Sequence, residues 1–220
     1  MDTDGPLATA PEAGHLLLVQ LLSPAFPTGA FAHAQGLEWA MAAGAVRDAG
    51  SLADWLGDVL EEGSGWSDAV LLSLALRPGA DHAELDALAR ALCLTAGRLT
   101  ETLEQGAAFA RAAGRLTGTD PAPAALPVAV GRACAGLAPP ATVIALHLHG
   151  QALNLVQAAV RFLPLGQSAG QGVLAGLGPA ILRLARRAET AGESDLGSCA
   201  IGAEIAQMRH ETMHTRIFRT

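Results

Sequence analysis

Apolar residues recur every three to four positions along most of the chain, and Pro or Gly interrupts each of these stretches. Ala and Leu dominate while β-branched and aromatic residues are sparse, so the pattern favours helices over strands. We expect helices over these residues: 15–22, 31 or 33 to 43, 51–62, 66–76, 81–95, 98–116, 126–137, 141–163, 167–188 and 195–208. The pattern therefore predicts an all-α, single-domain helical bundle of about nine to ten helices.

Three segments of this bundle differ in character. We interpret residues 1–13 as a flexible leader, residues 14–204 as the helical domain, and residues 205–220 as a docking tail of the same domain. Within the domain, Ser51 and Asp54 have the spacing of a capping box, which predicts a helix that starts at Ser51. After His214 only Ile217 and Phe218 are apolar, so we expect the tail to be mobile in the free protein.

The charge pattern changes this picture in one respect. The chain has 14 Lys and Arg residues, all of them Arg, against 21 Asp and Glu, so nucleic acid is not an expected partner. Charged residues make up 16% of the chain, below the roughly 25% of an average soluble domain. Because so few charges would leave much of a monomer's surface apolar, we expect other protein chains to cover part of it.

The cysteines and the apolar runs indicate the compartment. Cys93, Cys134 and Cys199 lie far apart and form no C-x-x-C pair, which is typical of small buried residues in a reducing compartment. The acidic amino terminus lacks the basic region of a secretion signal, and no apolar run reaches the roughly 18 residues of a membrane span. We therefore expect a cytoplasmic protein with no membrane partner.

The segment His210-Glu211-Thr212-Met213-His214 fits H-E-x-x-H, the zinc-hydrolase motif. Zinc hydrolases of this kind need a third ligand, and no His, Asp, Glu or Cys follows His214. Arg209, Arg216 and Arg219 would also oppose a dication. The alternative interpretation is a basic segment that docks onto another protein, and we favour it, with no catalytic and no metal site.

Polar side chains follow one stripe of the predicted helix 141–163. His147, Gln151, Asn154 and Arg161 stand at spacings of 4, 3 and 7 residues. The stripe is either a solvated face or, because it carries mostly neutral amides and imidazole, a surface within an interface or beside a wet cavity. A group of acids is likewise either a solvated face or a patch for a basic partner: Asp48, Asp54, Asp58, Glu61, Glu62 and Asp68.

Three separated segments together resemble the UreF family of urease accessory proteins. They are Phe31-Ala32-His33-Ala34-Gln35-Gly36-Leu37-Glu38, Pro164-Leu165-Gly166-Gln167 with Gly170-Gln171, and Ile205-Ala206-Gln207-Met208-Arg209-His210-Glu211-Thr212. Their order and spacing cover residues 16–220. The chain departs from the family pattern at Ala30, Ala34 and His214, where a glycine, a serine and a tyrosine are usual. The second histidine of H-E-x-x-H is thus one of the departures.

The resemblance implies an all-α, dimer-forming chaperone that has no catalysis of its own. Such proteins bind UreD (also called UreH) and recruit the GTPase UreG, and the complex delivers nickel to apo-urease. It implies no stably bound cofactor, since the complex handles nickel and UreG handles GTP. The alternatives are a zinc metallohydrolase and an unrelated helical protein-interaction module.

The resemblance also implies roles for named residues. The residues expected to bind UreD are Arg209, His210, Glu211, Arg216, Phe218 and Arg219. Those expected near the dimer or UreG-facing surface are Phe31, His33, Gln35, Gly36 and Glu38. In addition, we hypothesise that His147, Gln151 and Asn154 line a polar path for nickel.

Overall fold

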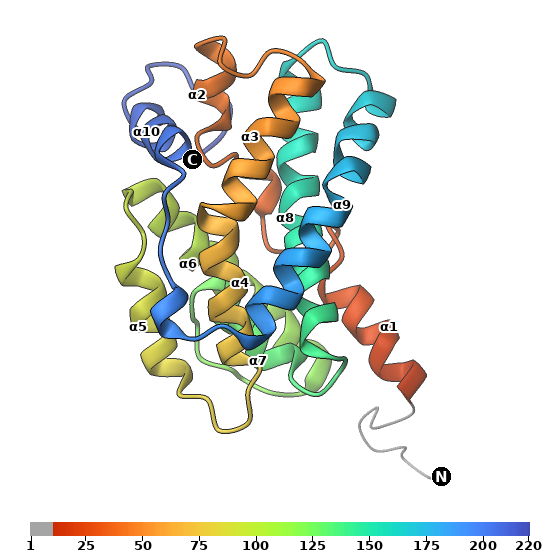
Figure 1. Cartoon of the computed structure of the whole chain (residues 1–220). Coiled ribbons are helices and arrows are strands. Elements are labelled where there is room, and N and C mark those ends of the chain that lie inside the picture. The colour runs from red at the N-terminus through yellow and green to blue at the C-terminus, as the bar shows by residue number, and fades with distance from the viewer. Residues whose placement is uncertain (1–10) are drawn as a thin grey trace.

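The computed structural model describes residues 11–220, which form ten α-helices, two 3-10 helices and no strand (Figure 1). The helices are α1 (Pro11–Leu21), η1 (Ala30–Ala32), α2 (Leu37–Ala42), α3 (Ala49–Glu61), α4 (Ser64–Ala75), α5 (His82–Ala91), α6 (Ala96–Thr117), α7 (Leu126–Cys134), α8 (Pro140–Phe162), α9 (Gln167–Thr190), η2 (Glu193–Asp195) and α10 (Ile201–His210). The predicted all-α fold class is confirmed. The first ten residues of the predicted leader lie outside the described residues, and its last three begin α1.

The bundle is built around α4. Every residue from Gly65 to Ala75 is buried, as expected for a helix that is apolar on nearly all sides. Helices α3, α7, α8 and α9 pack around it, and α8 and α9 form the most extensive helix pair (Figure 1). Helix α8 is long and apolar enough to cross a membrane by length and composition, but half of the relevant window is buried inside the protein, as in a core helix.

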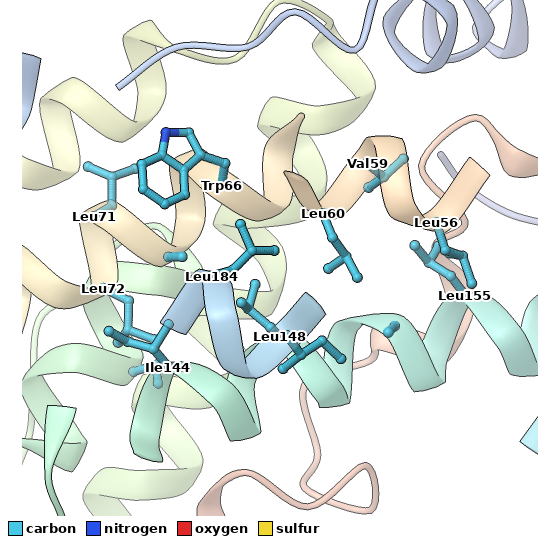
Figure 2. Close-up of a cluster of buried hydrophobic side chains, with 14 of the residues drawn as sticks. Leu56, Val59, Leu60, Trp66, Leu71, Leu72, Ile144, Leu148, Leu155 and Leu184 are labelled. Carbon is cyan, nitrogen blue, oxygen red and sulfur yellow. The ribbon is translucent and has the colours of Figure 1, made fainter. Parts of the chain in front are cut away.

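The core joins leucines from helices that are distant in the sequence. Figure 2 shows Leu60 of α3 near Leu148 of α8 and Leu184 of α9. All three side chains are almost fully removed from solvent. Each such burial stabilises the fold by about 1.5–3 kcal/mol. The helical spacing of apolar residues in the sequence therefore serves one continuous core.

Close helix packing needs glycine at particular positions. At Gly170 of α9 an added Cβ would lie 2.7 Å from Val160 Cγ2 of α8, so a side chain there would push these helices apart. At Gly166, Gly172 and Gly176 an added Cβ would meet nothing within 4 Å. Of these four glycines, only Gly170 is required for the close approach of α9 to α8.

Three helix starts differ from the prediction. The segment 31–43 is not one helix, because Gln35 and Gly36 are left-handed (φ +51° and +76°) and α2 begins only at Leu37. Helix α3 begins earlier than predicted: Asp48 is its N-cap, and Ser51 completes the capping box as the third helical residue. The last helix begins at Ile201 rather than 195, after η2 and an extended stretch.

Candidate docking tail and internal polar pocket

The tail after α10, residues 211–220, packs onto residues 32–38. Arg219 N donates to Ala32 O at 2.8 Å, and Ala34 N donates to Thr220 O at 2.9 Å. Phe218 is 4% exposed. Figure 1 shows the carboxyl end beside α10 and α2. The expectation of a mobile tail is wrong for this structure, because the partners of the tail lie near the start of the chain, where a local view of the sequence does not find them.

The carboxylate of Glu38 anchors the tail. It accepts hydrogen bonds from Ile217 N at 2.7 Å, Phe218 N at 2.9 Å and His210 Nε2 at 2.9 Å. Burial alone would raise the pKa of Glu38, but these donors outweigh burial and lower it from its ordinary value. A buried charge with this many donors is fully compensated, so the site is a structural anchor.

A second anchor lies at Thr220. Its hydroxyl is 3.0 Å from His33 Nδ1 and 3.4 Å from Glu101 Oε2. Beside it, the Arg219 guanidinium donates to both oxygens of Glu104 at 2.5 and 2.8 Å. Burial lowers the pKa of His33. The negative charge of Glu101 raises this pKa, and the positive charge of Arg219 lowers it. The tail is thus fixed at both Glu38 and Thr220.

The structure divides the residues predicted to bind UreD into two sets. His210 and Phe218 are buried, so neither is available to a partner while the tail is docked. Arg209, Glu211, Arg216 and Arg219 are exposed. Four exposed apolar residues on α10 and in the tail were not predicted from the sequence: Ile201, Ile205, Met208 and Ile217. The first three recur at i, i+4 and i+7 on α10, which is the signal that would have found them.

The residues predicted for the dimer or UreG-facing surface are also divided. Phe31 is 70% exposed. His33, Gln35, Gly36 and Glu38 are buried beneath the tail or inside the bundle. At Gly36, an added Cβ would lie 2.5 Å from Gln207 N of α10, so only glycine permits this close approach. Four of these five residues therefore support the tail from within.

Three residues of the polar stripe of α8 line a half-open cleft, which we call the inner pocket. It has a volume of about 110 Å³, and its lining includes His147, Gln151 and Asn154. Among the described residues, His147 Nε2 and Gln151 Oε1 are buried without a hydrogen-bond partner. Burial lowers the pKa of His147. Arg161, near the carboxyl end of α8, is exposed. The interpretation of the stripe as a solvated face therefore holds only at that end.

Asn154 also has a structural role. Its Nδ2 donates to Ala30 O at 2.9 Å and to His33 O at 3.1 Å, which fixes the loop before α2. Arg161 supports the same region, since its Nη2 donates to Phe31 O at 3.2 Å and its guanidinium lies 5.0 Å from the centre of the Phe218 ring. The end of α8 therefore carries both the loop and the tail.

A buried ion cluster borders the inner pocket. The Arg98 guanidinium donates to Asp68 Oδ2, and its Nη1 lies 3.7 Å from Glu101 Oε2. Glu101 Oε1 accepts from Gln35 Nε2 and Gln105 Nε2, both at 3.0 Å. Asp68 is buried in this cluster, so neither interpretation of the acidic group, a solvated face or a patch for a basic partner, applies to it. The Arg98–Glu101 spacing of i, i+3 was visible in the sequence, but the partner on α4 was not.

The structure gives no support to a zinc site at H-E-x-x-H. Helix α10 ends at His210, so His210 and His214 do not lie on consecutive turns of one helix. The Glu211 carboxylate instead accepts from Gly97 N at 2.9 Å, at the start of α6. Within residues 11–220, no group of three or more His, Cys, Asp or Glu side chains is placed to hold a metal ion.

Known proteins are similar to this chain over most of its length. The family model described as UreF matches residues 46–178. A urease accessory protein UreF of Paracoccus denitrificans (strain Pd 1222) is 63% identical over 211 residues, covering 96% of this chain and 98% of the relative. Those of Roseobacter denitrificans (strain ATCC 33942 / OCh 114) and Jannaschia sp. (strain CCS1) are 47% identical over 207 residues and 42% identical over 219 residues. These two matches cover 93% and 99% of this chain, and 93% and 100% of the relatives.

Proposed function

The chain belongs to the UreF family of urease accessory proteins, and from this membership we propose that it joins UreD (UreH) and the GTPase UreG in a complex that delivers nickel to apo-urease. Its role lies in urease maturation, and it is a non-catalytic chaperone. In the proposed complex UreG holds GTP, the complex handles nickel, and this chain retains no cofactor. The complex acts in the cytoplasm and contains two copies of this chain.

The observation that carries this proposal is the outer face of the docked tail. Ile205 and Met208 of α10 and Ile217 of the tail are exposed by 46%, 47% and 73%. Arg209 and Arg216, which are near these residues in the sequence, are exposed as well. An apolar centre with a charged rim is typical of a protein-binding surface. We propose that UreD binds this outer face, while Glu38 holds it in place from within.

Surface substitutions test this better than removal of residues 211–220, because removal would also take away the Ile217 and Phe218 amides that donate to Glu38. We expect Ile205→Glu to weaken co-purification with the UreD homologue at least about tenfold, as loss of a central apolar contact does. The control is Leu182→Glu on α9, which is 52% exposed and lies outside the tail face. Equal UreD binding by the wild type and Ile205→Glu, with the fold intact, would argue against the proposal.

Phe31 is the one exposed residue of the set proposed for the dimer and UreG-facing surface. We propose that its side chain contacts the second copy or UreG. Phe31→Glu would then lower the dimer fraction measured by light scattering, or the capture of UreG by the assembled complex. The control is Leu116→Glu, which is 47% exposed on α6. Wild-type mass and wild-type UreG capture in Phe31→Glu would contradict this role.

The inner pocket is proposed as part of the nickel path, since His147 and Gln151 line it and each has a buried polar atom without a hydrogen-bond partner. Gln151→Leu tests this more cleanly than a change that includes Asn154, which holds the Ala30–His33 loop. We expect slower urease activation by the assembled complex. Gln157→Leu, on the same helix and outside the pocket lining, is the matched control. Unchanged activation by Gln151→Leu would argue against the path.

A further inference from the structure

The end of the tail, Arg219 and Thr220, rests on a buried histidine. The His33 side chain is 2% exposed beneath it, and its Nδ1 is 3.0 Å from the Thr220 hydroxyl. That hydroxyl has a single proton, which it donates to Glu101 Oε2 at 3.4 Å, because a carboxylate only accepts. His33 Nδ1 is therefore the donor to Thr220. A second proton on this ring would have to bind at Nε2.

The other ring nitrogen of His33, Nε2, could pair with a carboxylate only by displacing Arg219. Glu104 lies toward it, but the distance from Nε2 to Glu104 Oε2 is 3.9 Å, which is too long for a hydrogen bond. Both oxygens of Glu104 already accept from the Arg219 guanidinium, at 2.5 and 2.8 Å. A protonated His33 and Arg219 would thus compete for one carboxylate. Proton uptake by His33 therefore opposes the docked position of Arg219.

Four charged side chains act on His33, three from α6 and one from the tail: Arg98, Glu101, Glu104 and Arg219. On the α8 side, the uncharged Asn154 amide donates to His33 O at 3.1 Å. Burial is the strongest influence and lowers the pKa of His33 from its ordinary value of 6.5. The two carboxylates raise this pKa, and the two guanidinium groups lower it.

The sign of the pH dependence follows from the burial of His33. When the end of the tail leaves, the ring becomes exposed and its pKa rises again, so release takes up a proton. Docking of the tail end has its full strength above about pH 6.5. It weakens as the pH falls toward the lower pKa that His33 has in the docked state.

Glu38 holds the preceding residues of the tail and responds to stronger acid. Burial would raise its pKa, but hydrogen bonds from Ile217 N, His210 and Phe218 N lower it from its ordinary value of 4.5. The anchor therefore has its full strength above about pH 4.5 and is lost only as the pH falls further. The positive charge that His210 gains in acid would strengthen its 2.9 Å contact with Glu38. The two ends of the tail thus respond to different pH ranges.

We propose that the tail is an acid-released strap that opens in two stages. In the first stage, the last two residues of the tail leave residues 32–34, driven by the proton that His33 takes up. In the second stage, Glu38 takes up a proton and releases the rest of the tail. Between about pH 6.5 and about pH 4.5, the strap is loosened at its end and still held at Glu38. This release belongs to the isolated chain and needs neither UreD nor UreG.

Backbone amides report the two ends of the strap separately. Arg219 N donates to Ala32 O at 2.8 Å and reports the end of the tail. The amides of Ile217 and Phe218, which donate to Glu38 at 2.7 and 2.9 Å, report the anchor. The protection of each amide is the exchange rate of an unstructured peptide divided by the measured rate at the same pH. The amides of α4, at the centre of the bundle, show whether the fold stays intact.

Hydrogen exchange of the isolated wild-type chain at about pH 7.5 and about pH 5.5 tests the first stage. We expect the protection of the Arg219 amide to fall at least about threefold at the lower pH, because release takes up a proton. Ile217 and Phe218 should keep their protection over this range. Unchanged protection of Arg219, or an equal loss at Arg219 and Phe218, would overturn the proposal.

The same measurement in stronger acid tests the second stage. Below about pH 4.5, Ile217 and Phe218 should lose protection while the amides of α4 remain protected. Protection of these two tail amides that persists to about pH 3.5 would show that protonation of Glu38 does not release the tail.

A variant identifies the group that takes up the first proton. His33→Gln removes the titrating ring and retains an amide that can donate to Thr220, so the protection of Arg219 should no longer change between about pH 7.5 and about pH 5.5. The control is His214→Gln, an exposed histidine of the same tail, which should keep the wild-type change. A wild-type change in His33→Gln would contradict the role of His33.

The wild-type comparison decides the proposal even where His33→Gln fails to dock the end of its tail, because it needs no substitution. It also separates the strap from the proposed UreD surface. No partner is present in the exchange measurement, so unchanged UreD binding by Ile205→Glu would leave the strap standing. Unchanged protection of Arg219 would leave the UreD surface standing.

Discussion

Two buried polar sites of this protein lie close together and differ in how completely they are satisfied. At Glu38, a single carboxylate meets His210 and the two tail amides of Ile217 and Phe218. In the inner pocket, His147 and Gln151 keep polar atoms without a partner. A fully compensated charge holds a structure in one state, whereas unpaired groups beside a cavity leave room for a guest. We therefore assign anchoring to the first site, and the role of the second in a nickel path stays a proposal.

The largest effect is expected from removal of the anchor. Glu38→Ala leaves the imidazole of His210 and two tail amides buried without their acceptor, so we expect a loss of about 3–5 kcal/mol in the free energy of unfolding. Urea denaturation followed by circular dichroism measures this loss. Glu104→Ala, which removes a half-exposed partner of Arg219, should cost no more than about 1 kcal/mol. Equal effects of the two substitutions would remove the distinction between anchor and surface pair.

A smaller loss of stability is expected from a substitution at Gly36, where residues 32–38 approach α10. Gly36→Ala adds both a left-handed alanine and a Cβ 2.5 Å from Gln207 N, whereas Gly44→Ala adds only the left-handed alanine, with nothing within 4 Å. We expect Gly44→Ala to cost about 1–2 kcal/mol and Gly36→Ala clearly more. Thermal unfolding of both variants gives the difference. Equal unfolding temperatures of the two variants would show that α10 leaves room for a Cβ at residue 36.

The smallest effect concerns the inner pocket and its pH dependence. Burial holds the pKa of His147 below its ordinary value of 6.5, so the unfolded chain takes up this proton first as the pH falls. The corresponding stability is present above about pH 6.5 and is lost as the pH falls toward the folded-state pKa. His147→Gln should flatten the stability–pH curve there, and His149→Gln, exposed on the same helix, is the control. A wild-type slope in His147→Gln would contradict this assignment.

Most helices could be predicted from the sequence because their apolar spacing is local. The segment 31–43 could not, since Gln35 is left-handed with its side chain held between Glu101 and Ser64, two residues on other helices. In the same way, Ser51 had the spacing of an N-cap, but Asp48 lay three residues earlier and took that role.

The candidate site was predictable only in part, for a similar reason. The spacing of His147, Gln151 and Asn154 is a property of one helix, so the sequence predicted that they share one stripe, and all three line the inner pocket. The pairing of Arg98 with Asp68, and of Glu38 with residues about 180 positions away, depends on how helices meet. Residue types and spacing alone do not contain that information, so the tail was expected to be mobile.

The most direct test of the anchored tail is amide hydrogen exchange of Ile217 and Phe218 in the isolated chain. Both amides donate to Glu38, at 2.7 and 2.9 Å. If the tail is docked before any partner binds, both amides will exchange at least about a hundredfold more slowly than in an unstructured peptide. Exchange at the unstructured rate would show that the tail is free until a partner orders it, and would contradict the central claim.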